Sequence, residues 1–145
     1  MYQRSLKLLF GLIAALALAG CASGPAYKDV AGNFPQLAPD QGRIYIYRAT
    51  SMGAAVQPDV KVNDEVVGSA VPNGFFYIDR PAGDYRISTS TEVKKTLTMQ
   101  LEPGQVRYVR LNIAMGLMVG HVYPELMDST EGQAELEKTK FTGTP

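Results

Sequence analysis

The side chain with the clearest chemical potential is Cys21, the only cysteine in the 145-residue chain. It follows Leu18, Ala19 and Gly20, and of these Ala19 and Gly20 are small, as a signal peptidase requires before its cleavage site. Once deprotonated, the thiol is a strong nucleophile. These four residues therefore predict cleavage of the bond between Gly20 and Cys21, which would place a reactive thiol at the new N-terminus.

The residues before Cys21 have the layout of a secretory signal. Arg4 and Lys7 give a positive start, and an apolar run follows from Leu8 to Ala19. A membrane-spanning helix needs about 20 consecutive apolar residues, so this run is too short to span a bilayer. We therefore expect residues 1–20 to be a signal peptide.

The four residues that end in Cys21 resemble the lipobox of bacterial lipoprotein precursors. The resemblance implies transfer of a diacylglyceryl group to the Cys21 thiol, cleavage before it, and acylation of the new amino group. An ordinary signal peptide with a chance cysteine is the alternative. Ala22, rather than aspartate, follows the cysteine. By resemblance to enterobacterial sorting rules, this favours the outer membrane over the inner membrane, with the domain facing the periplasm of the cell envelope.

The composition limits what the rest of the chain does. Lys and Arg number 14, as do Asp and Glu, and removal of Arg4 and Lys7 with the signal leaves a formal side-chain charge of −2. This gives no electrostatic footprint for a nucleic-acid partner. With its only thiol lipidated, the domain has no disulfide and no cysteine-ligated metal, so we expect no cofactor other than the covalent lipid and no metal site. Stability must then come from an apolar core.

The stretch after the cysteine predicts a tether. Residues 21–42 are rich in Gly, Pro, Ala and Asp, and Pro25, Pro35 and Pro39 disfavour a helix. A coil of this length spans roughly 25 Å, enough to hold the domain clear of a membrane. Phe34 and Leu37 are the bulky apolar residues late in the tether, and either dock on the domain or stay free.

Residues 43–145 carry the signals of a β domain. Ile44 and Ile46 alternate with Tyr45 and Tyr47, which suits a central strand covered on both faces. Further strands are expected at 59–62, 65–68, 75–79, 85–91, 96–102 and 106–113. Asn63-Asp64 is a two-residue hairpin turn signal.

The spacing of these strands predicts the fold. Short strands separated by turn signals are typical of an antiparallel sandwich or barrel. Thr130 to Gln133 fits a capping box and predicts one short helix after it, with a frayed end from Phe141 to Pro145. We expect a mainly β fold: a small antiparallel β-sandwich of about seven strands with one short C-terminal helix.

Two family resemblances follow from these motifs. Residues 60–68, then Pro81 to Tyr85, then residues 101–105 resemble the small β-sandwich modules named for a Pro-Glu-Gly-Ala motif, which are structural or binding units on bacterial surfaces. Residues 42–48, 57–60, 74–77 and 120–124 resemble a bacterial lipoprotein family classed as a domain of unknown function. The second resemblance implies a single secreted domain and no particular activity.

Candidate contact residues fall into two groups. Residues 114–120 are apolar, and form either a buried crossing or an exposed contact for a partner or membrane, with Met115, Leu117 and Met118 as the candidate interface. The second group is a set of tyrosines whose rings could bind a saccharide, although for the Tyr45 and Tyr47 pair we favour a role as core aromatics: Tyr45, Tyr47, Tyr77 and Tyr85.

Catalytic chemistry is not indicated. A Ser/His/Asp triad would need His121, the only histidine, and no serine lies in a nucleophile-elbow pattern. Dinucleotide-binding and phosphate-loop patterns are absent from the sequence. We therefore expect a non-enzymatic, lipid-anchored envelope module that binds a protein partner or supports an assembly. The alternative is a binder of envelope saccharide, such as peptidoglycan, or of another small ligand.

Overall fold

β1, Gln41–Arg48, is the central strand of the computed structural model, which describes residues 21–118 and 120–143. All of its residues from Gly42 onward are buried. Ile44 and Ile46 enter the core between two sheets, whereas Tyr45 and Tyr47 enter a second, aromatic cluster on the opposite face. The predicted division of this strand into two covered faces is confirmed.

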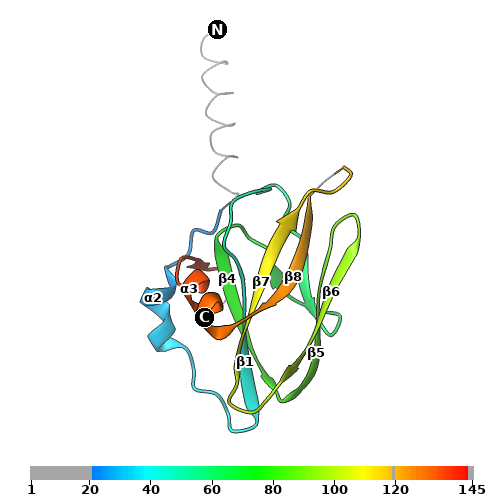
Figure 1. The fold of residues 1–145 in the computed structure, drawn as a ribbon. Coiled ribbons are helices and arrows are strands. Elements are labelled where there is room, and N and C mark those ends of the chain that lie inside the picture. Colours follow the sequence, from blue (N-terminus) through cyan, green and yellow to red (C-terminus); the bar gives the residue numbers. More distant parts are fainter. Residues whose placement is uncertain (1–20, 119, 144–145) are drawn as a thin grey trace, which may run out of the picture.

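Two sheets pack face to face as a β-sandwich (Figure 1). One has the strand order β8-β7-β1-β4-β9 and the other β3-β2-β5-β6. The predicted mainly β sandwich is confirmed, with nine strands among the described residues. The other eight are β2 (Asp59–Val62), β3 (Glu65–Ser69), β4 (Gly74–Pro81), β5 (Gly83–Ser90), β6 (Lys94–Leu101), β7 (Val106–Ala114), β8 (His121–Met127) and β9 (Lys140–Phe141).

The core between the sheets follows the alternation in the sequence. Met99 and Leu101 of β6 and Val109 and Leu111 of β7 belong to one core cluster between the sheets, and all four are at most 5% exposed. Burial of such side chains is the main favourable term in folding. Asn63 and Asp64 have φ values of 48° and 69°, as a type I′ turn requires, so the predicted β2–β3 hairpin is confirmed.

One pairing at the centre of the larger sheet differs from the antiparallel expectation. β1 runs antiparallel to β4, with Tyr45 opposite Tyr77, but parallel to β7, with Tyr45 opposite Tyr108. The chain reaches β7 from β6 in the other sheet, so it enters beside β1 at the same end. Gly104 donates its N–H to the carbonyl of Gln41 at 2.8 Å, which fixes this crossing.

The C-terminal part is ordered differently from the sequence prediction. Helix α3, Ser129–Leu136, begins at Asp128, whose carboxylate accepts the N–H groups of Thr130 and Glu131. The N-cap is therefore Asp128 and not Thr130, because the Asp128 carboxylate accepts the free N–H groups at the start of the helix and Thr130 is already inside it. The expected fraying from Phe141 is also wrong at that residue, since Phe141 pairs in β9 beside β4 and is 9% exposed.

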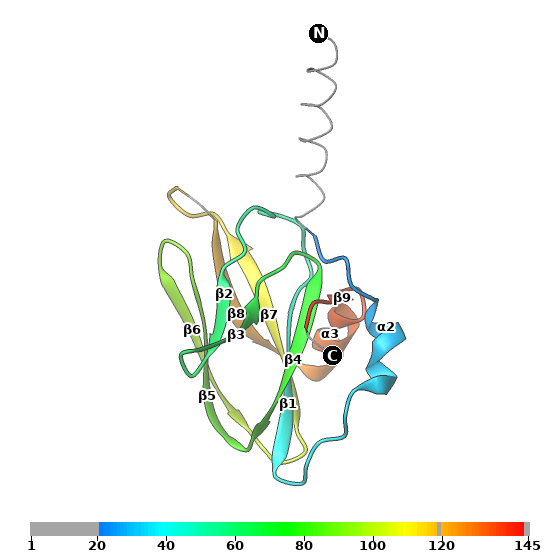
Figure 2. The ribbon, with the colours of Figure 1, turned by 180° about the vertical axis from the view of Figure 1, so that it is seen from behind.

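The face of β1 that carries the tyrosines is covered by short helical elements. These are α2 (Tyr27–Val30), the 3₁₀ turn η2 (Ala31–Asn33) and α3, and they lie together on the outer side of the larger sheet (Figure 2). No helix among the described residues is long and apolar enough to cross a membrane.

Candidate functional site

Cys21 lies directly against the folded domain. Its side chain is exposed. The next residue, Ala22, is 8% exposed and donates its N–H to the carbonyl of Pro72 at 3.0 Å. The expectation of a flexible tether over residues 21–42 is therefore wrong, because the segment is hydrogen-bonded to the sandwich from its second residue onward.

Backbone contacts hold this segment along the sheet. Phe141 donates its N–H to Pro25 at 2.8 Å, and Tyr27 donates to Thr139 at 3.3 Å. A Cβ on Gly24 would lie 1.9 Å from the carbonyl oxygen of Phe141, so only glycine allows this approach. The prolines that suggested a coil do not prevent docking, because the bonds run to another segment and not within a helix.

Aromatic packing explains why the segment docks. The Phe34 ring lies 4.5 Å from that of Tyr77 and 5.5 Å from that of Phe141, measured between centroids. Tyr27 contacts Phe75 and Tyr45 edge to face. Of the two residues left open by the sequence, Phe34 joins the aromatic cluster, whereas Leu37 is half-buried outside it.

An arginine clamp joins the same segment to β1 and β4. The Arg43 guanidinium donates from Nε and Nη2 to the two carboxylate oxygens of Asp79, at 2.7 and 2.8 Å. Nη2 also donates to the Pro35 carbonyl at 2.7 Å, and the guanidinium lies 4.4 Å from the Tyr77 ring centroid. The hydrogen bond to Asp79 raises the pKa of Arg43, so the clamp stays charged.

The four candidate tyrosines do not form one binding surface. Tyr45 and Tyr47 are buried, and the Tyr47 hydroxyl donates to Glu135 of α3 at 2.6 Å. Burial raises the pKa of Tyr47. Tyr77 is half-buried in the aromatic cluster, whereas Tyr85 packs against the core between the sheets and bonds to Pro81. A sugar therefore has no shared tyrosine platform here.

A groove opens where the N-terminal segment meets β4 and β9. It has a volume of about 670 Å³, within the usual range for ligand sites, and Cys21 is part of its wall. None of the described residues that line it carries a charge. We call it the Cys21 groove, and its bulky lining consists of Val30, Phe34, Pro35, Val71, Tyr77 and Phe141.

The apolar loop after β7 is exposed. Met115, Leu117 and Met118 are 91%, 94% and 86% exposed, so of the two alternatives the structure shows the open one. Glu92, in the turn between β5 and β6, accepts the N–H groups of Leu117 and Met118 at 3.2 and 2.6 Å. The loop is therefore tied to the neighbouring hairpin although its side chains have no cover among the described residues.

His121 has a structural position at the base of this loop. Its Nδ1 lies 3.1 Å from the Thr91 hydroxyl, and its Nε2 lies 3.5 Å from the Glu92 carboxylate. Among the residues described, no group of three His, Cys, Asp or Glu side chains could hold a metal ion. His121 thus links the β7–β8 loop to the β5–β6 turn.

The loop and Cys21 lie at the same end of the sandwich. In Figures 1 and 2 the described chain begins at the upper end, where the β7–β8 and β5–β6 turns also project. The loop after β1, in which Met52 is 66% exposed, lies at this end as well (Figure 1). We call this the anchor end.

Arg48 shapes the anchor end, and sequence reasoning missed it. It is fully buried, and its guanidinium donates to the carbonyls of Met52, Gly53, Val56 and Ala70 at 2.5–3.0 Å. Burial lowers its pKa. An arginine at the end of a strand gives no sequence signal for this role, because the acceptors are backbone carbonyls.

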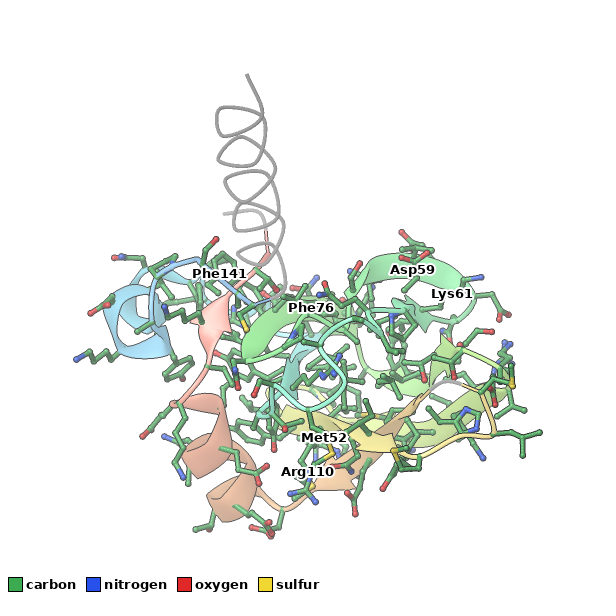
Figure 3. The ribbon with its side chains drawn as sticks, turned by 90° about the horizontal axis from the view of Figure 1, so that it is seen from above. Met52, Asp59, Lys61, Phe76, Arg110 and Phe141 are labelled. Atoms are coloured by element: carbon green, nitrogen blue, oxygen red, sulfur yellow. The ribbon has the colours of Figure 1, made fainter. Side chains whose placement is uncertain are left out.

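A second arginine holds α3 on the sheet. Arg110 of β7 pairs with Glu125 at 2.9 Å, Glu131 at 3.3 Å and Glu135 at 2.8 Å. Hydrogen bonds to Arg110 and then Asn112 lower the pKa of Glu125. Arg110 lies beside α3 in Figure 3. One arginine is thus shared by three carboxylates, and it joins β7 to β8 and to α3.

Comparison with known proteins places the chain in a family. Residues 38–122 match the model of a family described as a protein of unknown function, DUF2846. The match covers more than half of the chain. The chain belongs to the DUF2846 family. This agrees with the coarser of the resemblances in the sequence, a domain of unknown function, and brings no activity with it.

The chain also resembles an individual protein along most of its length. An uncharacterised protein of Haemophilus influenzae is 30% identical over 129 residues, covering 86% of this DUF2846 chain and 77% of the relative. No solved structure matches. In the DUF2846 match, the arginines of β1 and the β7–β8 loop are included, whereas Cys21 and α3 lie outside the matched range.

Proposed function

We propose that this protein is a lipid-anchored, non-catalytic module of the bacterial cell envelope that binds a protein partner through its anchor end. The lipobox-like residues before Cys21 support the anchor. The absence of a tether after Cys21 supports a domain seated directly on the membrane surface, which we take to be the periplasmic side of the outer membrane.

The observation that carries partner binding is the exposed but hydrogen-bonded loop at residues 114–118. Three neighbouring large apolar side chains are each at least 86% exposed. Leaving them in water is unfavourable, and contiguous apolar patches of this kind mark contact sites. Methionine adapts its shape to varied protein surfaces.

A protein surface fits this loop better than lipid does. Loops that insert into bilayers carry aromatic or basic residues at the interface. The described loop has neither, and its base is held by the carboxylate of Glu92, which an anionic lipid surface repels. Because the loop lies at the same end of the sandwich as Cys21, the partner we propose is itself at the membrane. The saccharide alternative is weaker, since Tyr45 and Tyr47 are buried.

The anchor is tested by Cys21→Ser. We expect this variant to lose palmitate labelling and to leave the membrane fraction, because the acyl chains need the thiol. The matched control is Ser23→Ala, a neighbouring position of similar size, which should stay labelled and membrane-bound. Unchanged membrane association of Cys21→Ser would refute the anchor.

Partner binding is tested by photo-crosslinking in intact cells from a photoreactive residue in place of Leu117. We expect one specific protein adduct, lost when Met115 and Met118 are both changed to serine. The same probe in place of Val66, which is 52% exposed on β3, should give no such adduct. Adducts with phospholipid alone would show that the loop contacts the bilayer and not a protein partner. The absence of any specific adduct would refute the proposal.

A further inference from the structure

The Cys21 groove has the chemistry of an alkyl-binding site. Its wide walls are the rings of Phe34, Tyr77 and Phe141 together with Val30 and Val71, and no described lining residue is charged. A phosphate or a sugar bound there would lose hydration without gaining ion pairs or a dense set of hydrogen bonds. A hydrocarbon chain gains by leaving water and requires neither.

The groove also continues beyond its first chamber. A second hollow of about 360 Å³ shares Val71, Tyr77 and Phe141 with it and extends toward Phe76 and β3. Both hollows follow the outer edge of the larger sheet, where Figure 3 shows Phe141 and Phe76 on neighbouring strands. The hollow is therefore elongated, as an extended chain requires, although the wall of its second part is more polar than that of the first.

The position of Cys21 identifies the occupant. Cys21 is itself a wall residue of the groove, and Ala22 is fixed to Pro72 immediately after it. Any chain attached to the sulfur or amino group of Cys21 begins at the edge of the groove. Its effective concentration there is high, so it enters with little loss of translational entropy.

We propose that the Cys21 groove holds one acyl chain of the lipidated Cys21. This rests on the lipid anchor of the proposed function. The remaining two chains of a triacylated cysteine stay in the bilayer, and two chains suffice for stable anchoring. The seated chain fixes the orientation of the sandwich on the membrane and keeps the anchor end toward it.

The test uses the full-length protein in its native membrane, with the photoreactive residue benzoylphenylalanine in place of Asn33. Asn33 is exposed and lines the groove. Benzoylphenylalanine in place of Asp29, exposed on the preceding turn and outside the groove lining, is the matched control. After irradiation and digestion, mass spectrometry reads the molecule joined to each probe.

We expect the probe at position 33 to join the acyl group carried by the N-terminal Cys21 peptide, and the probe at position 29 not to do so. Val71→Phe, which fills the part shared by both hollows, should reduce the position 33 adduct to the control level. The control substitution Val66→Phe should not. These two variants are compared at equal amounts of folded protein.

Other outcomes overturn the proposal in distinguishable ways. Cross-links from position 33 only to separate phospholipids, to residues of the chain or to nothing would show that the lipid on Cys21 lies elsewhere, while the anchor stands. A Cys21 peptide without acyl mass would refute the anchor and the occupant together. An adduct unaffected by Val71→Phe would place the chain outside the groove.

Discussion

Two arginines of β1, Arg43 and Arg48, have different structural roles although they lie on the same strand. Arg43 meets the Asp79 carboxylate and carries its charge as a paired ion. Arg48 is buried among backbone carbonyls and fixes the conformation of a loop.

Ala22 is constrained by packing. It is buried, and a Cβ on Gly74 would lie 3.2 Å from its methyl group. The small side chain of Ala22 is therefore needed for packing, in addition to any role of this position as a sorting signal.

At the residue scale, Arg43→Ala should destabilise the domain by about 3 kcal/mol, because removing one partner of a buried pair leaves the other without compensation. The side chains of Arg43 and Asp79 are only 10% and 18% exposed. Arg86→Ala breaks a pair with Asp64 whose side chains are 52% and 60% exposed, and should cost far less, because water screens an exposed ion pair. Urea unfolding of both variants checks the contrast, and equal losses would contradict it.

At the scale of elements, two segments cover the larger sheet, and they are attached to it by different interactions. The N-terminal segment, residues 22–40, is held by aromatic rings, by the Arg43 clamp and by single backbone bonds to β9. Helix α3 is held by Arg110 and by the Tyr47 hydroxyl, and Leu136 is its fully buried apolar anchor. Both cover the tyrosine face of β1, which would otherwise be exposed.

The start of α3 yields the prediction at this scale. Asp128→Ala should destabilise the domain by about 1 kcal/mol, because two helix N–H groups lose their acceptor. Thr130→Ala, at the position the sequence suggested as the cap, should have a smaller effect. Thermal unfolding followed by circular dichroism compares the two. A larger effect at Thr130 would show that the cap observed in the structure is wrong.

At the scale of the whole molecule, the anchor point and the exposed apolar side chains share one end. Under the proposed lipid anchor, this end would face the membrane, and the opposite end and the outer face of the β3-β2-β5-β6 sheet would face the aqueous compartment. The docked N-terminal segment fixes the orientation of the sandwich relative to Cys21, since a free coil would let the sandwich rotate about its attachment point.

The matching prediction concerns a flexible Gly/Ser insert between Cys21 and Ala22. The lipid should still form and the protein should stay in the membrane, but the adduct from position 117 should weaken because the sandwich is no longer held in a fixed orientation on the membrane. The same insert after Gly143 is the control and should leave the adduct unchanged. An adduct of full strength with the N-terminal insert would show that partner binding does not depend on seating.

Local patterns in the sequence determined much of this protein. Alternation placed Ile44 and Ile46 opposite Tyr45 and Tyr47, and Asn63-Asp64 specified a hairpin, because both effects depend on neighbours along the chain. The lipobox-like signal at Cys21 is local too. Only the tertiary structure decided that residues 22–40 dock, that β7 joins β1 in parallel, and that Cys21 borders an apolar groove. The docking and the groove depend on Phe34, Tyr77 and Phe141 meeting from segments far apart in sequence, and the parallel pairing depends on a crossing between the two sheets. A pattern of a few neighbouring residues contains no information about such distant pairings.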